Sequence, residues 1–197
     1  IDSSGNIANS VVDTLEFDAT EGKFPKLIDI DGDIYAIAYT GNGNDGWLAT
    51  VDIDSSGNIA NSVVDTLEFD NVKGNTPDIE NISADIYAIA YTGNGDDGWL
   101  ATVDIDSSGN IANSVVDTLE FDNVKGLTPD ITQVSGDSYV IAYEGNAVDG
   151  WLATVDIDSS GNIANSVVDT LEFDATEGKT PSIISIPSGD MFAIAYS

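Results

Sequence analysis

The alternation of apolar and polar positions divides the chain into short segments of the β type. Residues 85–92 (DIYAIAYT) are apolar at both parities, which predicts a strand covered on both faces. Residues 98–105 (GWLATVDI) are rich in strand-favouring side chains, and residues 76–82 (TPDIENI) begin near a proline and carry scattered apolar positions. In residues 61–70 (NSVVDTLEFD), one face is apolar and the other mostly polar, which is typical of a half-exposed outer strand.

These segments belong to a long internal repeat. Glycine, asparagine, aspartate and serine separate the segments as turns, and no segment shows a sustained helical period with caps. The string IDSSGNIANSVVDTLEFD recurs unchanged with a period of 52 residues, starting at positions 1, 53, 105 and 157. Four strands in about 50 residues are typical of a propeller blade. We therefore predict an all-β fold, a β-propeller of four-stranded antiparallel blades; the alternative is a β-solenoid, whose rungs are usually shorter.

The phase of the repeat predicts how the blades are ordered along the chain. We name the strands of one blade a (from Pro77), b, c and d, with a lining the central channel and d outermost. Residues 1–197 then form one repeat domain that begins with a d segment, ends after strands a and b, and has an incomplete last unit. We expect the chain to be part of a longer propeller, or another chain to supply the absent strand c to an open edge.

The charge narrows the classes of partner. The net charge is −30, from 35 acidic residues against five basic ones, while 42% of the residues are hydrophobic and provide a core. Such a surface repels phosphate backbones and anionic lipid, and no stretch is apolar enough to span a bilayer. We therefore expect no nucleic-acid partner and no membrane insertion. A surface this acidic favours cations and solubility at high salt.

One repeat resembles a known type of surface protein. Residues 85–105 (DIYAIAYTGNGDDGWLATVDI) are similar to the tandem propeller repeats of large archaeal and bacterial surface proteins. In those repeats an AIAY strand is followed by a glycine–aspartate loop and then by an aromatic-led strand. The resemblance implies an extracellular or cell-surface location and a non-catalytic module, and it supplies no catalytic residues. It weakens at residues 145–150 and 186–197.

The recurring string DIDSSGN could be a calcium loop or a turn. Counted from Asp52, the first, third and fifth positions offer oxygen ligands, and Gly57 is the sixth residue. A calcium loop of the EF-hand type also needs a ligand at position nine and a bidentate glutamate at position twelve, where this chain has Ala60 and Val63. We therefore interpret the string as a tight turn between strands c and d, with Gly57 or Asn58 free to take a positive φ.

The loops between strands b and c are the better candidate for a metal. In a four-stranded meander these loops emerge on the same face as the d–a linkers, which carry lysines. Their amide and carboxylate oxygens suit Ca²⁺, which is the cofactor that the sequence suggests. A glycine-rich turn explains the same pattern without a metal. The predicted metal-ligating residues are Asn42, Asn44, Asp45, Asn94, Asp96, Asp97 and Asp149.

One tryptophan per repeat is the candidate ligand contact. Trp47, Trp99 and Trp151 open strand c, where a flat aromatic face could stack on a sugar ring. The same residues would also pack well between blades, with the indole N–H satisfied near a loop. The sequence leaves both roles open.

These observations lead to two expectations about function. With no histidine, cysteine or arginine, and with its acids repeated in every blade, the chain is expected not to be an enzyme. The acids that do not repeat, such as Glu80 and Glu144, have no partner that the sequence reveals. The first expectation is an extracellular scaffold, adhesion or assembly module that forms filaments or oligomers with other protein chains. The second is a lectin-like propeller that binds surface glycans, with calcium, through one shallow pocket per blade.

Overall fold

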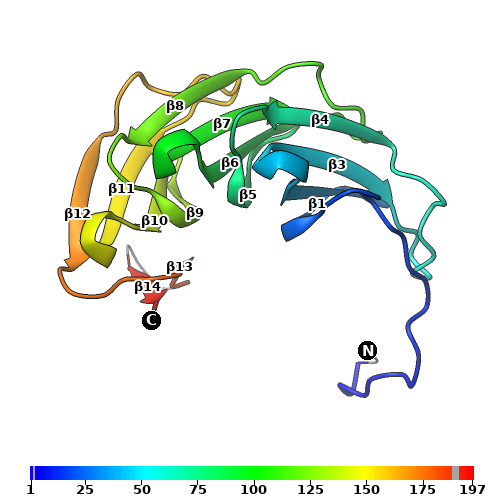
Figure 1. Ribbon diagram of the computed structural model, residues 1–197. Coiled ribbons are helices and arrows are strands. Elements are labelled where there is room, and N and C mark those ends of the chain that lie inside the picture. The colour runs from blue at the N-terminus through cyan, green and yellow to red at the C-terminus, as the bar shows by residue number, and fades with distance from the viewer. Residues whose placement is uncertain (2, 188–190) are drawn as a thin grey trace.

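The computed structural model consists of antiparallel β-sheets arranged in an arc (Figure 1). It describes residue 1 and residues 3–187 and 191–197. The first blade comprises β1 (Lys23–Asp31), β2 (Ile34–Thr40), β3 (Gly46–Asp52) and β4 (Asp65–Asp70). The second comprises β5 (Asn75–Ser83), β6 (Ile86–Thr92), β7 (Gly98–Asp104) and β8 (Asp117–Asp122). The third comprises β9 (Leu127–Ser135), β10 (Ser138–Glu144), β11 (Gly150–Asp156) and β12 (Asp169–Asp174). The strand pair β13 (Ser182–Ser185) and β14 (Phe192–Ala195) follows.

The predicted fold class is confirmed. Each blade is an antiparallel meander in the predicted order a, b, c, d, and no sheet in the described residues has the rungs of a solenoid. The strands a lie along the concave side of the arc, and β4, β8 and β12 lie on its convex side (Figure 1). Neighbouring strands a contact one another, from β1 to β5, β5 to β9 and β9 to β13. Side chains on these four inner strands therefore lie close to one another on the concave side of the arc.

The d segments differ from the prediction in two ways. The d strands begin at Asp65, Asp117 and Asp169 rather than at the preceding asparagine, because residues 61–64 and their equivalents still belong to the bend after strand c. The first copy of the d segment, residues 9–18, is not a strand, since no neighbouring strand among the described residues pairs with it. Leu15 and Phe17 nevertheless pack on the first blade as their counterparts do in later repeats.

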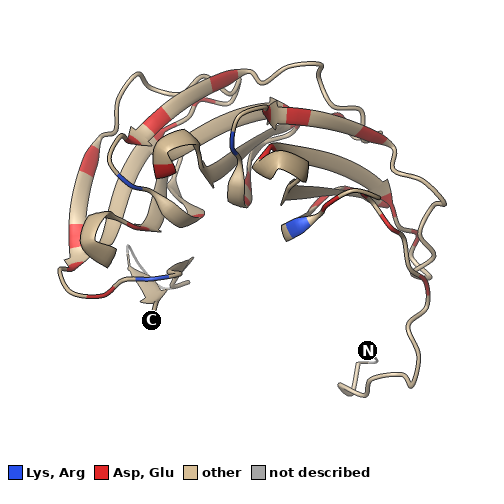
Figure 2. Ribbon diagram, in the orientation of Figure 1, with Lys and Arg blue, Asp and Glu red and all other residues tan. Residues whose placement is uncertain are grey.

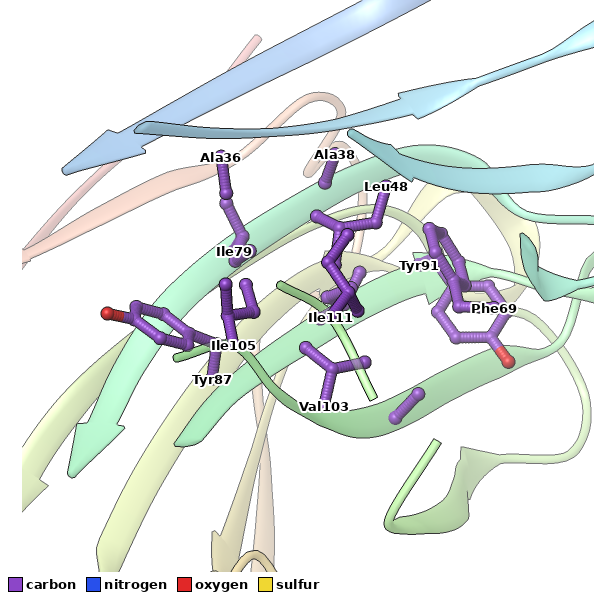
Figure 3. Packing of buried hydrophobic residues seen from close by; sticks show 12 residues of the cluster. Ala36, Ala38, Leu48, Phe69, Ile79, Tyr87, Tyr91, Val103, Ile105 and Ile111 are labelled. Atoms are coloured by element: carbon purple, nitrogen blue, oxygen red, sulfur yellow. The ribbon is translucent and has the colours of Figure 1, made fainter. Parts of the chain in front are cut away.

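Neighbouring blades fit together because each has one face of small and one of large side chains. In β2 the alternate residues Ala36 and Ala38 are fully buried and face the second blade, which presents Ile79, Ile89 and Tyr91 (Figure 3). In β6 the corresponding alanines face the third blade in the same way. The period-two alternation of a strand thus gives each blade a flat face and a bulky face, and stacking them fills the space between blades.

A repeated hydrogen bond fixes the position of each blade on the one before it. Tyr91 on β6 donates its hydroxyl proton to Asp70 at the end of β4, at 3.0 Å, and Tyr143 bonds Asp122 in the same way at 2.9 Å. Each tyrosine ring also meets the phenylalanine beside its partner edge-on; Phe69 and Tyr91 have centroids 5.1 Å apart. Burial, together with the neighbouring Asp70 carboxylate, raises the pKa of Tyr91 well above its usual range, so its hydroxyl stays a donor.

The recurring DIDSSGN string forms a tight turn between strands c and d, as the sequence predicts. Asp54 accepts hydrogen bonds from the backbone N–H groups of Ser56 and Asn58 and from the Asn58 side chain, at 2.7–2.9 Å. Gly57 has a φ of 83°, which the turn requires. These bonds, led by those from Asn58, lower the pKa of Asp54, and they occupy its carboxylate in building the turn rather than in binding a metal.

The b–c loops and the d–a linkers lie on the same face, as predicted. Gly74 in the first linker donates its N–H to the carbonyl of Asn44 in the b–c loop of the first blade, at 2.8 Å. In the same linker the Lys73 ammonium forms an ion pair with Asp96 in the b–c loop of the second blade. Acidic residues lie along the outer strands, whereas the lysines lie near the points where the inner strands begin (Figure 2).

The tyrosine–aspartate bond predicts a stability change that depends on burial. We expect Tyr91→Phe to lower the free energy of unfolding by about 1 kcal/mol, because the buried tyrosine loses its hydrogen bond to the half-buried Asp70 carboxylate. Tyr196→Phe is the matched control: Tyr196 makes the same bond to Asp174 but is 46% exposed, so water replaces the lost donor. Urea denaturation of both variants measures the difference, and equal losses would contradict it.

Candidate functional site

The inner strands enclose a small hollow where they begin. Its volume is about 280 Å³, and its walls come from four successive repeats, at residues 24–26, 76–77, 128–130 and 180–182. Each wall contributes a proline, so the lining is largely apolar, with Lys26 and Asp130 as its charged members. A hollow that every inner strand lines is where a propeller can hold a ligand against several blades at once.

The backbone beside this hollow is strained in every repeat. Phe24, Thr76, Thr128 and Thr180 have φ values between 45° and 49°, in the left-handed region that β-branched residues rarely adopt. In the three complete blades this residue lies in a bulge, where the register between strands a and b shifts. Strain that recurs around one hollow, held there by the surrounding sheets, is typical of a functional site.

Charged side chains at the inner positions differ from repeat to repeat, unlike the rest of the blade. The residue that follows the proline is Lys26 in the first blade, Asp78 in the second, Asp130 in the third and Ser182 in the last pair. The Lys26 ammonium lies 3.1 Å from an Asp78 oxygen, and the other Asp78 oxygen accepts the Ile131 N–H at 2.9 Å. Asp130 lies close enough to Asp78 for its side chain to raise the pKa of the Asp78 carboxyl group. Two carboxyl groups and an ammonium thus form one continuous polar group across three blades.

Glu80 lies near the same cluster. It follows Asp78 by two residues on β5, and the carboxylates of Asp78 and Asp130 repel its own. Glu144, which was expected to have no partner, is paired with the Lys125 ammonium at 2.8 Å. The sequence did hold the signal: position 80 is isoleucine or threonine in the other repeats, so an acid there is an exception to the pattern.

Burial and mutual repulsion keep protons on the cluster to unusually high pH. Burial raises the pKa of Asp78 to about 6, helped by Asp130 and opposed by Lys26. Burial also raises the pKa of Glu80 to about 7, helped by the Asp78 and Asp130 carboxylates. Partial burial lowers the pKa of Lys26, but the two aspartates outweigh it and the pKa rises. A proton donor and a carboxylate can therefore coexist here near neutral pH.

The tryptophans lie elsewhere, at the junctions between blades. Trp47, Trp99 and Trp151 are half-buried, and each indole covers the glycine that begins its b–c loop. Trp99 lines a hollow of about 370 Å³ between the first two blades, and Trp151 lines one of about 630 Å³ between the second and third. Part of each ring packs against the blade, and the rings of Trp99 and Trp151 also face an opening. Ligand contact by Trp47, Trp99 and Trp151 stays a prediction.

The residues predicted to bind metal are spread over the b–c loops. Asn42 and Asn44, like Asn94 and Asp96, lie in single turns of 3₁₀-helix with exposed side chains, and Asp45, Asp97 and Asp149 follow these turns. Among the described residues, no group of three or more acidic side chains is placed to hold a metal ion. Calcium binding through the amide and carbonyl oxygens of these loops stays a prediction.

No helix in the described part of the chain is long and apolar enough to cross a membrane.

Comparison with known proteins gives matches of structure but not of sequence. No protein-family model matches the chain, and no curated protein matches it. Among solved structures, it is similar to the NanB sialidase of Streptococcus pneumoniae, with a TM-score of 0.57 and 12% identity over 82% of this chain. It is also similar to a protein described as a candidate exo-β-1,3-galactanase from Bifidobacterium bifidum S17, with a TM-score of 0.54 and 14% identity over 94% of this chain.

A third similar structure is a thermostable family-43 glycoside hydrolase, with a TM-score of 0.51 and 12% identity over 87% of this chain. The chain spans 25% of the sialidase, 62% of the galactanase and 64% of the family-43 hydrolase. At these identities the likeness shows the fold, a β-propeller.

These neighbours correct the functional expectation drawn from sequence. The chain was expected to be a non-enzymatic scaffold or adhesion module, or else a lectin, but the similar propellers are described as carbohydrate-processing enzymes. Non-repeating acids such as Glu80 are visible in the sequence, but the carboxylate of Asp130 becomes their neighbour only when the blades pack. The β-propeller fold that the resemblance to surface repeats implies is confirmed.

Proposed function

We propose that the chain forms part of a carbohydrate-acting β-propeller that hydrolyses glycosidic bonds at the inner-strand cluster. The observation that carries the proposal is the group of Asp78, Glu80 and Asp130, in which pKa values of about 6 and about 7 accompany a shared charge environment. Glycoside hydrolysis needs one carboxyl group that is still protonated at the working pH and one that is ionised. The cluster supplies both beside an open hollow.

Burial assigns the roles within the cluster. Glu80 is half-buried and keeps its proton to about pH 7, so it is the general acid that protonates the leaving oxygen. Asp130 lines the hollow and supplies the carboxylate that activates water or attacks the sugar. Asp78 is only 8% exposed and is a positioning residue, since its charge raises the pKa of Glu80 and Lys26 holds its carboxylate.

The similar structures support the choice of substrate class. Their descriptions name a sialidase, a galactanase and a glycoside hydrolase, which all act on sugars. An extracellular location, which the resemblance to surface repeats implies, agrees with a polymeric glycan as substrate, and we propose it with the activity. The chain spans less than two thirds of the length of these neighbours. The substrate of the whole propeller is therefore also part of this proposal.

The first test is direct hydrolysis. We expect the chain to release a chromophore from one or more aryl glycosides in a panel of arabinofuranosides, galactosides and sialosides. We expect Glu80→Gln and Asp130→Asn each to lower kcat at least about 100-fold, as loss of a general acid or base does. Glu172→Gln, an exposed acid on the outer strand β12, is the matched control and should retain full activity. Folded wild-type protein that hydrolyses none of the panel would overturn the proposal.

The pH dependence of the rate tests the role of Asp78. We expect kcat/KM to fall as the pH rises above about 7, because Glu80 then loses the proton that it must donate. In Asp78→Asn the neighbouring negative charge is gone, so the pKa of Glu80 falls and this limb should move to lower pH. An unchanged limb in a folded Asp78→Asn variant would show that Asp78 does not act through Glu80.

Stability against pH gives a test that needs no substrate. Asp78 has a pKa of about 6 in the folded protein against an ordinary value near 4 when unfolded. Its contribution to stability is therefore fully present below about pH 4 and is lost as the pH rises through 6. Relative to wild type, Asp78→Asn should gain melting temperature between pH 4 and pH 7, whereas Glu172→Gln corrects for the change in total charge. A wild-type-to-Asp78→Asn difference that stays constant over this range would contradict the shifted pKa.

A further inference from the structure

The hollow between the second and third blades lies apart from the central cluster. Its volume is about 630 Å³, and it is bounded by the outer strand β8 on one side and by the b–c loop, β11 and β12 of the third blade on the other. This volume falls within the usual range of small-molecule sites. Neither the fold nor the proposed hydrolysis uses this hollow.

The hollow has a rigid aromatic floor and one accessible aromatic wall. Phe121 and Tyr143 are buried, at 5% and 1% exposure, and meet edge-on with centroids 5.2 Å apart. Tyr143 donates its hydroxyl proton to Asp122 at 2.9 Å, so the floor is held in place. Trp151 lines the hollow and is half-exposed, which leaves part of its ring for a ligand.

The polar groups at the edge differ in how much of their bonding capacity is used. The Asp122 carboxylate is committed, because it accepts the Tyr143 hydroxyl on one oxygen and two backbone N–H groups of the following linker on the other. Asn123, Asn146 and Asp149 also line the hollow, and Asn123 and Asn146 are exposed. Their amide and carboxylate groups can donate to and accept from hydroxyls.

Substitutions near this hollow distinguish it from its counterpart. Between the first two blades the hollow is about 370 Å³, and there Lys73 in the linker is ion-paired with Asp96 in the b–c loop. In the next repeat Val148 replaces that aspartate, so this ion pair cannot form. Lys125 pairs instead with Glu144, at the end of β10. The linker and the loop at the second junction are therefore not joined by a lysine–aspartate pair, and the hollow there is larger.

We propose that this hollow is a second carbohydrate-binding site, for a neutral saccharide that stacks on Trp151 and bonds to Asn123, Asn146 and Asp149. One accessible aromatic face with amides and a carboxylate around it suits the apolar face and the hydroxyls of a sugar ring. A quaternary ammonium ligand is held best by a cage of several exposed ring faces, whereas here Phe121 and Tyr143 are buried and Trp151 alone of the lining aromatic residues is accessible. The carboxylates around the hollow repel an acidic sugar.

The site is tested by binding, independently of hydrolysis. Titration calorimetry of the full chain carrying Glu80→Gln measures affinity for neutral arabino-, galacto- and gluco-oligosaccharides, for a sialylated oligosaccharide and for tetramethylammonium. We expect one or more of the neutral oligosaccharides to bind, and Trp151→Ala to weaken that binding about tenfold. Trp99→Ala, at the smaller junction, is the matched control and should change the affinity by less than about twofold.

A second variant keeps the test valid if Trp151→Ala is destabilised. Asn146→Ala removes an exposed amide without changing the packing, and we expect it to weaken the same binding with no change in melting temperature. Three results would overturn the proposal: no neutral saccharide bound, tighter binding of tetramethylammonium or the sialylated sugar, or affinities that Trp151→Ala and Asn146→Ala leave unchanged. Hydrolysis by wild-type protein without this binding would overturn the second site and leave the central one standing.

Discussion

The contact between the alanine face of one blade and the bulky face of the next is what the rest of this structure depends on. Ala36 and Ala38 leave room into which Ile79 and Tyr91 of the following blade fit, and the tyrosine then reaches the aspartate that ends the outer strand behind it. At the last junction Val140 replaces the first of these alanines and is buried beside Ile183. Side chains larger than valine would separate the blades, since closely packed interiors tolerate added volume poorly. The inner strands, and the groups that they carry, are held at fixed separations by this contact.

Repetition and exception have different meanings in such a molecule. Residues that recur in every blade, such as Asp54 in its turn or Tyr143 on its aspartate, have their hydrogen bonds committed to structure. The positions that vary lie mostly on the inner strands, in the d–a linkers and in the b–c loops. The proposed central site consists of such exceptions on a repeated framework, namely the acids at positions 78, 80 and 130. The second proposed site is formed mainly by recurring residues, and the exceptions near it, Glu144 and Val148, distinguish it from its counterpart.

Much of the fold could be predicted because the 52-residue period and the period-two alternation are local properties of the sequence. The order of strands, the c–d turn at Asp54 and the common face of loops and linkers all follow from them. The central cluster could not be assembled in the same way, because Asp78 and Asp130 lie on different blades and become neighbours only when those blades pack. Nor does a sequence reveal how far burial raises the pKa of Glu80. The sequence shows an acid at position 80 where residues 28, 132 and 184 are isoleucine or threonine. That difference indicates a site only once strand a is known to line the centre.

The two unlike faces of each blade also affect how such a chain can change over generations. Every unit carries both the socket for its successor and the knob for its predecessor, so a copied unit joins its neighbours without further adjustment. Gene duplication can therefore lengthen the array in one step, and near-identical repeats are a natural product of that process. A newly added unit brings a spare inner-strand position, free to acquire a charge of its own while the older units keep theirs.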